Sequence, residues 1–243
     1  MSQNLFPKWT NYLPTLAAIA VVTGGAVVVS IVAYFFGPTH TDVGYQPEQP
    51  IHYSHRLHAG QLGMDCRYCH NTVEYAAHSA IPPTSTCMNC HGGSSGKGIH
   101  WNGLTPTGDL ANGTSPEIAK LHAAHDAGLP VEWEKVHLLP DYAYFNHSVH
   151  LNLAGDMAVG CVECHGRIDQ MEVVYQVEPL SMGWCLECHR DPAPHLRPKN
   201  EATNMRWLDE ISAEELAAVT QSAQKLVENG EIAPPEHCSA CHR

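Results

Sequence analysis

Phenylalanine is scarce in this sequence, with four residues among 243, whereas proline and glycine number 17 and 19. A chain of this length can ordinarily bury an apolar core of its own. Proline and glycine interrupt regular elements, and few large side chains are left to fill an interior. The sequence therefore predicts short helices and loops that wrap around a core which side chains alone do not supply.

Signatures of hydrolytic chemistry are also missing. The sequence has no phosphate-binding loop, no serine nucleophile motif and no paired-carboxylate motif, so we predict no catalytic residues of those kinds. The formal net charge of -12 argues against a nucleic-acid partner. The same charge would attract a basic protein partner, or it would simply keep the surface well solvated.

No cysteine is left over from one repeated pattern, Cys-x-x-Cys-His. The copies are CRYCH (Cys66, Cys69, His70), CMNCH (Cys87, Cys90, His91), CVECH (Cys161, Cys164, His165), CLECH (Cys185, Cys188, His189) and CSACH (Cys238, Cys241, His242). This pattern is the attachment site of c-type haem. Its two thiols bond to the porphyrin, and its histidine becomes the proximal ligand of the iron. The sequence thus predicts five covalently bound haem c groups.

Other uses of paired cysteines fit less well. Structural zinc needs four ligands, so five pairs would leave one pair unmatched. A redox dithiol expects one pair on an α/β scaffold, and no repeated βαβ pattern is present. A disulfide framework would not require a histidine after every second cysteine. All three alternatives leave the five histidines unexplained.

A haem that only passes electrons needs a second axial ligand, and an internal repeat suggests four of them. YSHRLH contains His55 and His58, and FNHSVH contains His147 and His150. The two stretches lie 92 residues apart, and each precedes two haem motifs that are themselves offset by 95 and 98 residues. This regularity indicates duplication of a two-haem module. Histidines three residues apart can ligate two different irons.

These stretches resemble small trihaem cytochromes of the c7 type, in which the first histidine of such a pair serves the next haem and the second serves the one after. The resemblance implies the ligand pairs His55 with His70, His58 with His91, His147 with His165, and His150 with His189. For the His242 haem we predict His137. The alternatives are His78, His122, His125, His195, Met64, Met157, Met171 and Met182. The expected fold class is mostly α and irregular, with c7-like two-haem modules repeated and packed around five haems.

An uncharged segment from Leu13 to Phe36 predicts one N-terminal transmembrane helix. At about 1.5 Å per residue it would measure ~36 Å, enough for a hydrocarbon core of ~30 Å. Aromatic residues stand at both ends, as interfacial aromatics do. A cleaved signal peptide would have a shorter apolar core, so we predict an uncleaved anchor. Because haem of this type is attached outside the bacterial cytoplasmic membrane, we expect the haem domain on the periplasmic side.

The expected organisation has five parts. They are a short cytoplasmic N-terminus (1–12), the anchor (13–36), a linker (37–50), a first module with two haems and an insertion (51–130), and a second module with two haems, a C-terminal helix and the fifth haem (131–243). Two helices have clear end signals. One starts after Ser115 and stops at Gly128, and the other starts at a capping box of Ser212 and Glu215.

Four stretches together, IHYSHRLHAGQLGMDCRYCH, IPPTSTCMNCH, LPDYAYFNHSVH and LSMGWCLECHRDP, resemble the pentahaem cytochrome subunit of bacterial alternative complex III. The resemblance implies an electron-transfer subunit without enzymatic activity of its own. It also implies membrane subunits that oxidise quinol, an iron–sulfur (molybdopterin-like) subunit and a monohaem cytochrome c as partners. The alternatives are a multihaem enzyme acting on nitrite or hydroxylamine, which needs an open iron site, and a stand-alone quinol dehydrogenase cytochrome.

Overall fold

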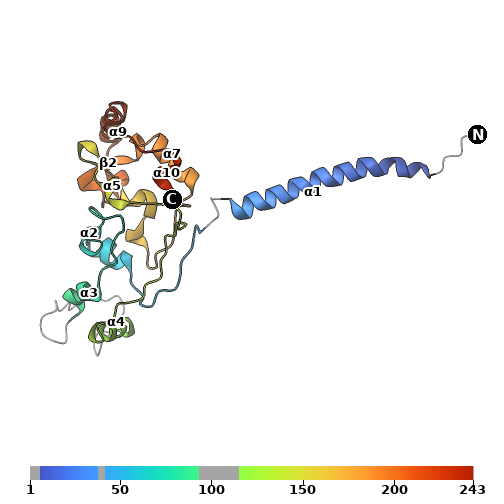
Figure 1. The fold of residues 1–243 in the computed structure, drawn as a ribbon. Coiled ribbons are helices and arrows are strands. Elements are labelled where there is room, and N and C mark those ends of the chain that lie inside the picture. The colour runs from blue at the N-terminus through green and yellow to red at the C-terminus, as the bar shows by residue number, and fades with distance from the viewer. Residues whose placement is uncertain (1–5, 38–41, 93–114, 243) are drawn as a thin grey trace, which may run out of the picture.

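Helices and loops make up almost all of the computed structural model, which describes residues 6–37, 42–92 and 115–242 (Figure 1). The prediction of mostly helical and irregular structure is confirmed. The α-helices are α1 (Leu13–Phe36), α2 (Cys66–Cys69), α3 (Thr84–His91), α4 (Pro116–Asp126), α5 (His147–Leu151), α6 (Cys161–His165), α7 (Met182–Arg190), α8 (Trp207–Glu210), α9 (Ala213–Glu228) and α10 (Cys238–Cys241). Part of the expected linker, 38–41, and most of the expected insertion, 93–114, lie outside the described residues.

Shorter elements complete the described chain. They are the 3-10 helices η1 (Lys8–Tyr12), η5 (Ala154–Asp156), η6 (Ile168–Gln170), η7 (Ala193–His195) and η8 (Lys199–Glu201), the π-helix η2 (Arg56–Gln61), and the strands β1 (Met157–Val159) and β2 (Leu196–Pro198). The two strands pair antiparallel, with Met157 opposite Pro198. They join the segment just before the third Cys-x-x-Cys-His motif, which forms β1, to the segment that follows the fourth motif, which forms β2.

Helix α1 has the bounds expected for the apolar segment, and it projects away from the remaining chain (Figure 1). None of its residues is buried. Together with η1 it forms a helix from Lys8 to Phe36 that is long and apolar enough to cross a membrane, with a mean hydropathy of 2.5 over an 18-residue stretch. The hydroxyl groups of Thr23 and Ser30 each donate to a carbonyl oxygen four residues earlier, at 2.8 Å. These two hydroxyl groups are thus satisfied within the helix, as an apolar surrounding requires.

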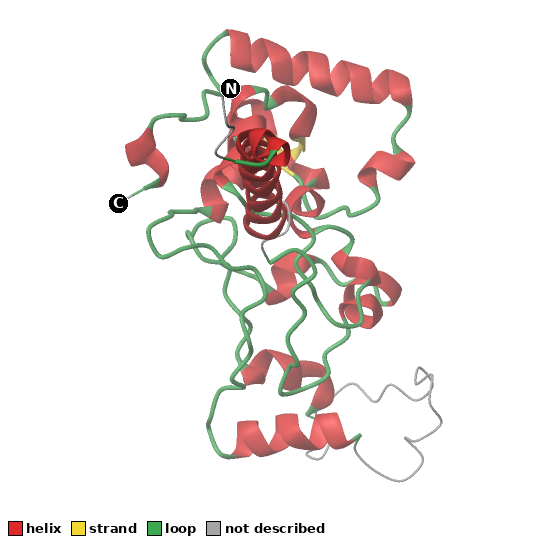
Figure 2. Ribbon diagram, turned by 90° about the vertical axis from the view of Figure 1, so that its right-hand side faces the viewer, coloured by secondary structure: helices red, strands yellow, loops and turns green. Residues whose placement is uncertain are grey.

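The rest of the chain forms an elongated body with α9 at one end and α4 at the other (Figures 1 and 2). Helices α4 and α9, at the two ends of this body, start where the sequence predicts. Ser115 accepts a hydrogen bond from the Glu117 amide at the start of α4. Ser212 and Glu215 form both halves of a capping box at the start of α9. These caps satisfy amides that the first helical turn leaves without partners.

The apolar core formed by side chains is small. One buried cluster joins α9 to the β1–β2 pair and its surroundings, and it consists of Met157, Ala193, Leu196, Ala223 and Ile232. A second consists of Leu151, Ala158 and Ala202. Both clusters lie in the half of the body that contains α9. The half around α2, α3 and α4 has little buried apolar surface in the described residues, namely Ile51 and Leu121.

We expect Gly60→Ala to destabilise the body. A Cβ atom at this position would overlap the backbone carbonyl oxygen of Asp169, where η2 packs against η6. Backbone at such a contact cannot move aside as a flexible side chain can, so the cost should be about 1–3 kcal/mol. The measurement is the urea midpoint of the haem-loaded protein, followed by circular dichroism.

Gly183→Ala is the matched control. It also adds one methyl group, but the nearest atom to the new Cβ is 3.9 Å away. Because alanine is the better helix former, α7 should be unchanged or slightly more stable. Equal midpoints for Gly60→Ala and the unmodified protein would contradict the close packing of η2 on η6.

Candidate haem-binding sites

All five Cys-x-x-Cys pairs lie on helical turns. Two of them make up the whole of α2 and α10, and the other three lie in α3, α6 and α7. Residues three apart on a helix share one face, so the two thiols of each pair point to the same side. All ten thiols are free rather than joined in disulfides. Each turn therefore offers two reactive thiols to a single group, with a histidine directly after them.

The short turns are fixed at their starts by local hydrogen bonds. Asp65 caps α2 by accepting from the Arg67 amide, and Ser181 caps α7 by accepting from the Trp184 amide. Asp65 also accepts from the Arg67 side chain at 2.8 Å. A four-residue helix has little stability of its own, so such caps matter more here than in a long helix.

Five of the histidines that the sequence selects as iron ligands share one hydrogen-bonding arrangement. In each, Nδ1 donates to a backbone carbonyl oxygen: His58 to Ser54 (2.8 Å), His70 to Ala80 (2.9 Å), His147 to Ala77 (2.9 Å), His150 to Asn146 (2.7 Å) and His189 to Pro235 (2.8 Å). A carbonyl can only accept, so the ring proton is on Nδ1 in each case. Nε2 keeps its lone pair for a metal, and the ring orientation is fixed.

Three pairs of imidazole rings have the separation that a shared iron requires. Two metal–nitrogen bonds of about 2 Å each put the ring centroids roughly 6 Å apart. The centroid distances are 6.1 Å for His58 and His91, 6.3 Å for His150 and His189, and 6.4 Å for His147 and His165. Burial, and after it the nearby His70, lowers the pKa of His55 to about 4. His55 and His70 are therefore also neighbours. The buried Nδ1 of His55 has no hydrogen-bond partner among the described residues.

An aromatic ring holds both histidines in each copy of the repeat. Tyr53 stacks on His58 at 4.4 Å and meets His55 edge-on at 4.8 Å. Phe145 stacks on His150 at 4.8 Å and meets His147 edge-on at 4.7 Å. The same geometry thus occurs twice, although one pair stands at a π-helix and the other on α5. The repeated sequence pattern corresponds to a repeated arrangement of rings.

His137, the residue expected to serve the His242 haem, lies beside His165. Its Nε2 is 3.2 Å from Nδ1 of His165, and the ring centroids are 4.4 Å apart. His242 makes its ring contact with Tyr142, at 5.8 Å. Backbone contacts tie down the turn that carries it, since the Tyr144 amide donates to the Cys241 carbonyl at 2.8 Å.

The alternatives to His137 have other contacts or surroundings. His122 donates through Nε2 to the His91 carbonyl at 2.7 Å. His125 lies beside Asp126, and His195 lies beside Glu163. Met157 belongs to the apolar cluster under α9, whereas Met182 is largely exposed.

The five attachment turns form a spatial series whose order differs from their order in the chain. Turn α3 lies next to α2, where the Asn89 amide nitrogen donates to the Tyr68 hydroxyl at 3.1 Å. Turn α2 lies next to α6, where the Cys161 thiol lowers the pKa of Cys66 and the Cys66 thiol raises the pKa of Cys161, so the two side chains are neighbours. The Thr203 hydroxyl reinforces this second junction by donating to Asp65 at 2.9 Å.

The series continues from α6 to α7 and then to α10. Burial, followed by the nearby Cys188 thiol, raises the pKa of Cys164 to about 12, so α6 and α7 are neighbours. Burial and then the Cys241 thiol raise the pKa of Cys185, so α10 is next to α7. Figure 1 shows α7 and α10 together in one half of the body and α2 and α3 in the other. The complete order is α3, α2, α6, α7 and α10.

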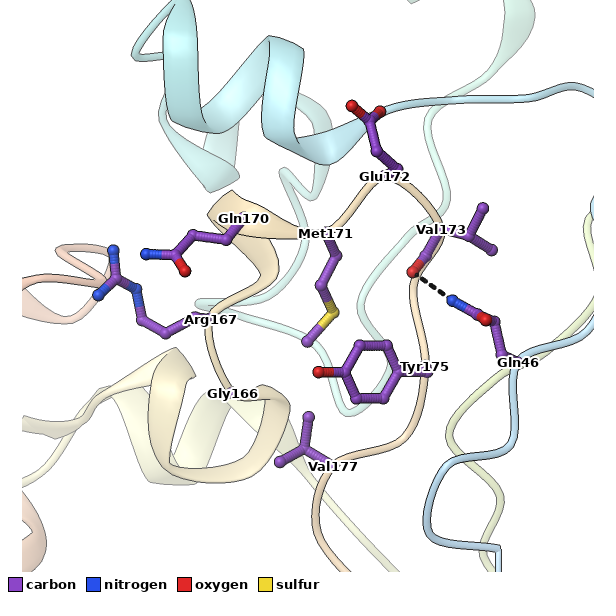
Figure 3. Close-up of a pocket in the computed structure, with 9 residues that line it drawn as sticks. All are labelled: Gln46, Gly166, Arg167, Gln170, Met171, Glu172, Val173, Tyr175 and Val177. Carbon is purple, nitrogen blue, oxygen red and sulfur yellow. Dashed lines mark hydrogen bonds between the residues drawn. The ribbon is translucent and has the colours of Figure 1, made fainter.

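Two cavities adjoin the middle of this series. One, of about 630 Å³, begins directly after His165 and is shown in Figure 3, with Arg167, Met171 and Tyr175 among its lining residues. The other, of about 530 Å³, includes Cys66 in its wall. Volumes of this size are typical of cofactor pockets. Of the ten cysteines, only Cys66 is among the residues that line these two cavities.

A buried ion pair at the third motif had no signal in the sequence. The Arg197 side chain is 1% exposed and donates to a carboxylate oxygen of Glu163 at 2.5 Å. Its guanidinium carbon lies 4.8 Å from the centre of the Trp207 ring. Glu163 stands between the two cysteines of CVECH, so this contact fixes α6 to β2. Only the folded chain brings these residues together, because 34 positions separate them in sequence.

Comparison with known proteins finds one similar multihaem cytochrome. The chain is 31% identical over 121 residues to the multihaem cytochrome c subunit of menaquinone reductase from Nitratidesulfovibrio vulgaris. The match covers 49% of this chain and 47% of that protein, so the chain spans about half the length of its relative. No family model matches the chain.

Five c-type haems are bound covalently to this chain. The free thiol pairs on helical turns and the histidines with available Nε2 atoms suit that group. The protein is thus a multihaem cytochrome c.

We expect the double substitution Cys238→Ser and Cys241→Ser to reduce the haem count by one. The mass of the denatured unmodified protein should exceed the mass of its polypeptide by five haem groups, and that of the variant by four. Ser239→Ala, in the same turn, is the control and should retain all five. An unchanged mass gain in the double variant would show that α10 is not an attachment site.

Proposed function

We propose that this protein is a membrane-anchored pentahaem electron-transfer subunit of a quinone-converting complex. The observation that carries this proposal is the unbroken spatial series of attachment turns from α3 to α10. A series of this kind suits passage of electrons along the body, whereas an enzyme needs one distinct iron site for its substrate. The similarity to a subunit of menaquinone reductase supports a quinone partner.

We propose four axial ligand pairs: His55 with His70, His58 with His91, His147 with His165, and His150 with His189. Ring separations near 6 Å support the last three, and the closeness of His55 to His70 supports the first. His137 is not assigned to the His242 haem, because its Nε2 is already engaged by His165.

The chain's own residues would prepare each site for rapid electron transfer. When bound, haem iron supplies one-electron chemistry between its ferric and ferrous states. The carbonyl oxygens that hold Nδ1 keep the histidine rings from rotating. Two fixed imidazoles leave little to rearrange when the charge of the iron changes. The stacked rings of Tyr53 and Phe145 limit movement further and exclude water from the histidine pairs.

Helix α1 would anchor the body in the bacterial cytoplasmic membrane, with the attachment turns on the periplasmic side. Its exposed apolar surface supports this, and so do the exposed aromatic side chains near both ends, Trp9 and Phe36 among them. The resemblance to alternative complex III favours electron flow from quinol, through membrane and iron–sulfur (molybdopterin-like) subunits, to a monohaem cytochrome c or another external carrier. The name of the relative describes reduction of menaquinone, and therefore the opposite direction.

Removing a proposed distal ligand should open one iron. We expect His58→Ala and His150→Ala each to add one carbon monoxide-binding haem, and the double variant to add two, because each ring lies about 6 Å from its proximal partner. The measurement is the carbon monoxide difference spectrum of the reduced protein.

The control is His122→Ala. This ring lies near His91 but uses Nε2 to donate to its carbonyl oxygen, so its loss should add no carbon monoxide-binding haem. If both ligand variants behave like this control, the proposed pairs are wrong.

The proposed function is tested by adding a short-chain naphthoquinol to two preparations. One is the complex purified gently from membranes, and the other is the isolated full chain. We expect rapid haem reduction in the complex and none in the isolated chain, because the quinone site would belong to a partner subunit. Reduction of the isolated chain would instead support a stand-alone quinol dehydrogenase. Turnover of nitrite or hydroxylamine by the reduced chain would support an enzyme.

A further inference from the structure

The proximal histidine of the third motif differs from two others in its hydrogen-bond partner. Nδ1 of His70 and of His189 each meets a backbone carbonyl oxygen. Nδ1 of His165 instead meets Nε2 of His137 at 3.2 Å, with the two ring planes 78° apart. An edge-on approach of this kind directs an N–H of one ring at a lone pair of the other. In this motif a side-chain nitrogen therefore replaces the backbone carbonyl oxygen that is the partner of Nδ1 in the other two motifs.

The direction of this hydrogen bond follows from the chemistry of the motif. His165 directly follows Cys164 on its helical turn, as His70 follows Cys69, so the same nitrogen, Nε2, must face the iron. The proton of His165 is then on Nδ1, which donates, and His137 accepts through Nε2.

The surroundings exclude a simpler role for His137 as the axial ligand of His165's iron. An iron shared with His165 would fit between His165 and His147, because their ring centroids are 6.4 Å apart and their planes are 7° from parallel. The centroid of His137 is only 4.4 Å away, too close for an iron to lie between the rings. Its contact is with the side of His165 that faces away from the metal.

We infer that His137 is a positioning residue for the third haem: it accepts the Nδ1–H hydrogen bond of His165 and thereby lowers the reduction potential of that haem. A ring nitrogen is a stronger acceptor than a peptide carbonyl, so it makes His165 a more basic ligand, which favours ferric iron. The inference deepens the proposed function and rests on it, because α6 is the middle turn of the series. The central haem would then differ in potential from its neighbours through one side chain.

The experiment is a spectroelectrochemical titration of the isolated, haem-loaded full chain and three variants. His137→Leu removes the acceptor, and His137→Gln restores one near the position of Nε2. We expect His137→Leu to shift one of the five haems about tenfold toward the ferrous state, which is ~59 mV for a one-electron couple. His137→Gln should return that haem most of the way. His122→Leu, the control, should shift no haem by this amount.

Two results would overturn the inference. One is an unchanged set of five potentials in His137→Leu. The other is a new high-spin, carbon monoxide-binding haem in that variant, which would make His137 an axial ligand. If His137→Leu fails to fold, the ferric unmodified protein decides. One of its low-spin electron paramagnetic resonance signals should then have the narrowed spread of g values that a partly deprotonated imidazole produces, and its absence would overturn the inference.

The titration uses neither quinone nor partner subunits. An unchanged set of potentials would therefore overturn the role of His137 and leave the proposed function standing, whereas failure of naphthoquinol to reduce the complex would overturn the proposed function itself.

Discussion

The structure depends on one local constraint, which is that two thiols and an imidazole must meet the same flat group from one helical turn. Cys-x-x-Cys puts the thiols on one face, and the next residue puts a ring beside them. Because a turn of four or five residues is barely stable alone, each is held by caps and by contacts with a neighbouring turn. Asp65 shows both effects, since it caps α2 and accepts from Thr203 near the next turn. Attachment and folding are therefore parts of one process.

The small core follows from the same constraint. Side-chain clusters lie where α9 covers the two short strands, and they are built from residues such as Met157 and Ala223. Elsewhere the chain consists mostly of loops and short turns between the proposed ligand histidines and the cysteine pairs. Large apolar side chains next to ligand positions, Val149 among them, are exposed in the polypeptide alone. Covalently bound porphyrins would cover such surfaces, so most of the interior of this protein belongs to its cofactors rather than to its side chains.

Features with local causes could be predicted from the sequence. The helix from Leu13 to Phe36 follows from composition, and the start of α9 follows from a capping box three residues apart. The carbonyl partner of His189 could not be predicted, because Pro235 lies 46 positions away. The contact between His137 and His165 also depends on the fold of the loop between them. The sequence thus indicates which histidine rings could bind iron through Nε2, whereas long-range packing decides which group partners Nδ1 of each ring.

The order of the attachment turns has a consequence for how such a chain could evolve and work. In each half, the second motif lies further from the junction between the halves than the first, as α3 does beyond α2 and α7 does beyond α6. Duplication of a two-turn unit followed by contact of the first turns, through Cys66 and Cys161, joins two short series into one without a new connection. The final turn, α10, then extends one end only. This places the junction, where His165 is buried among four other histidines, at the position through which every electron crossing between the halves would pass.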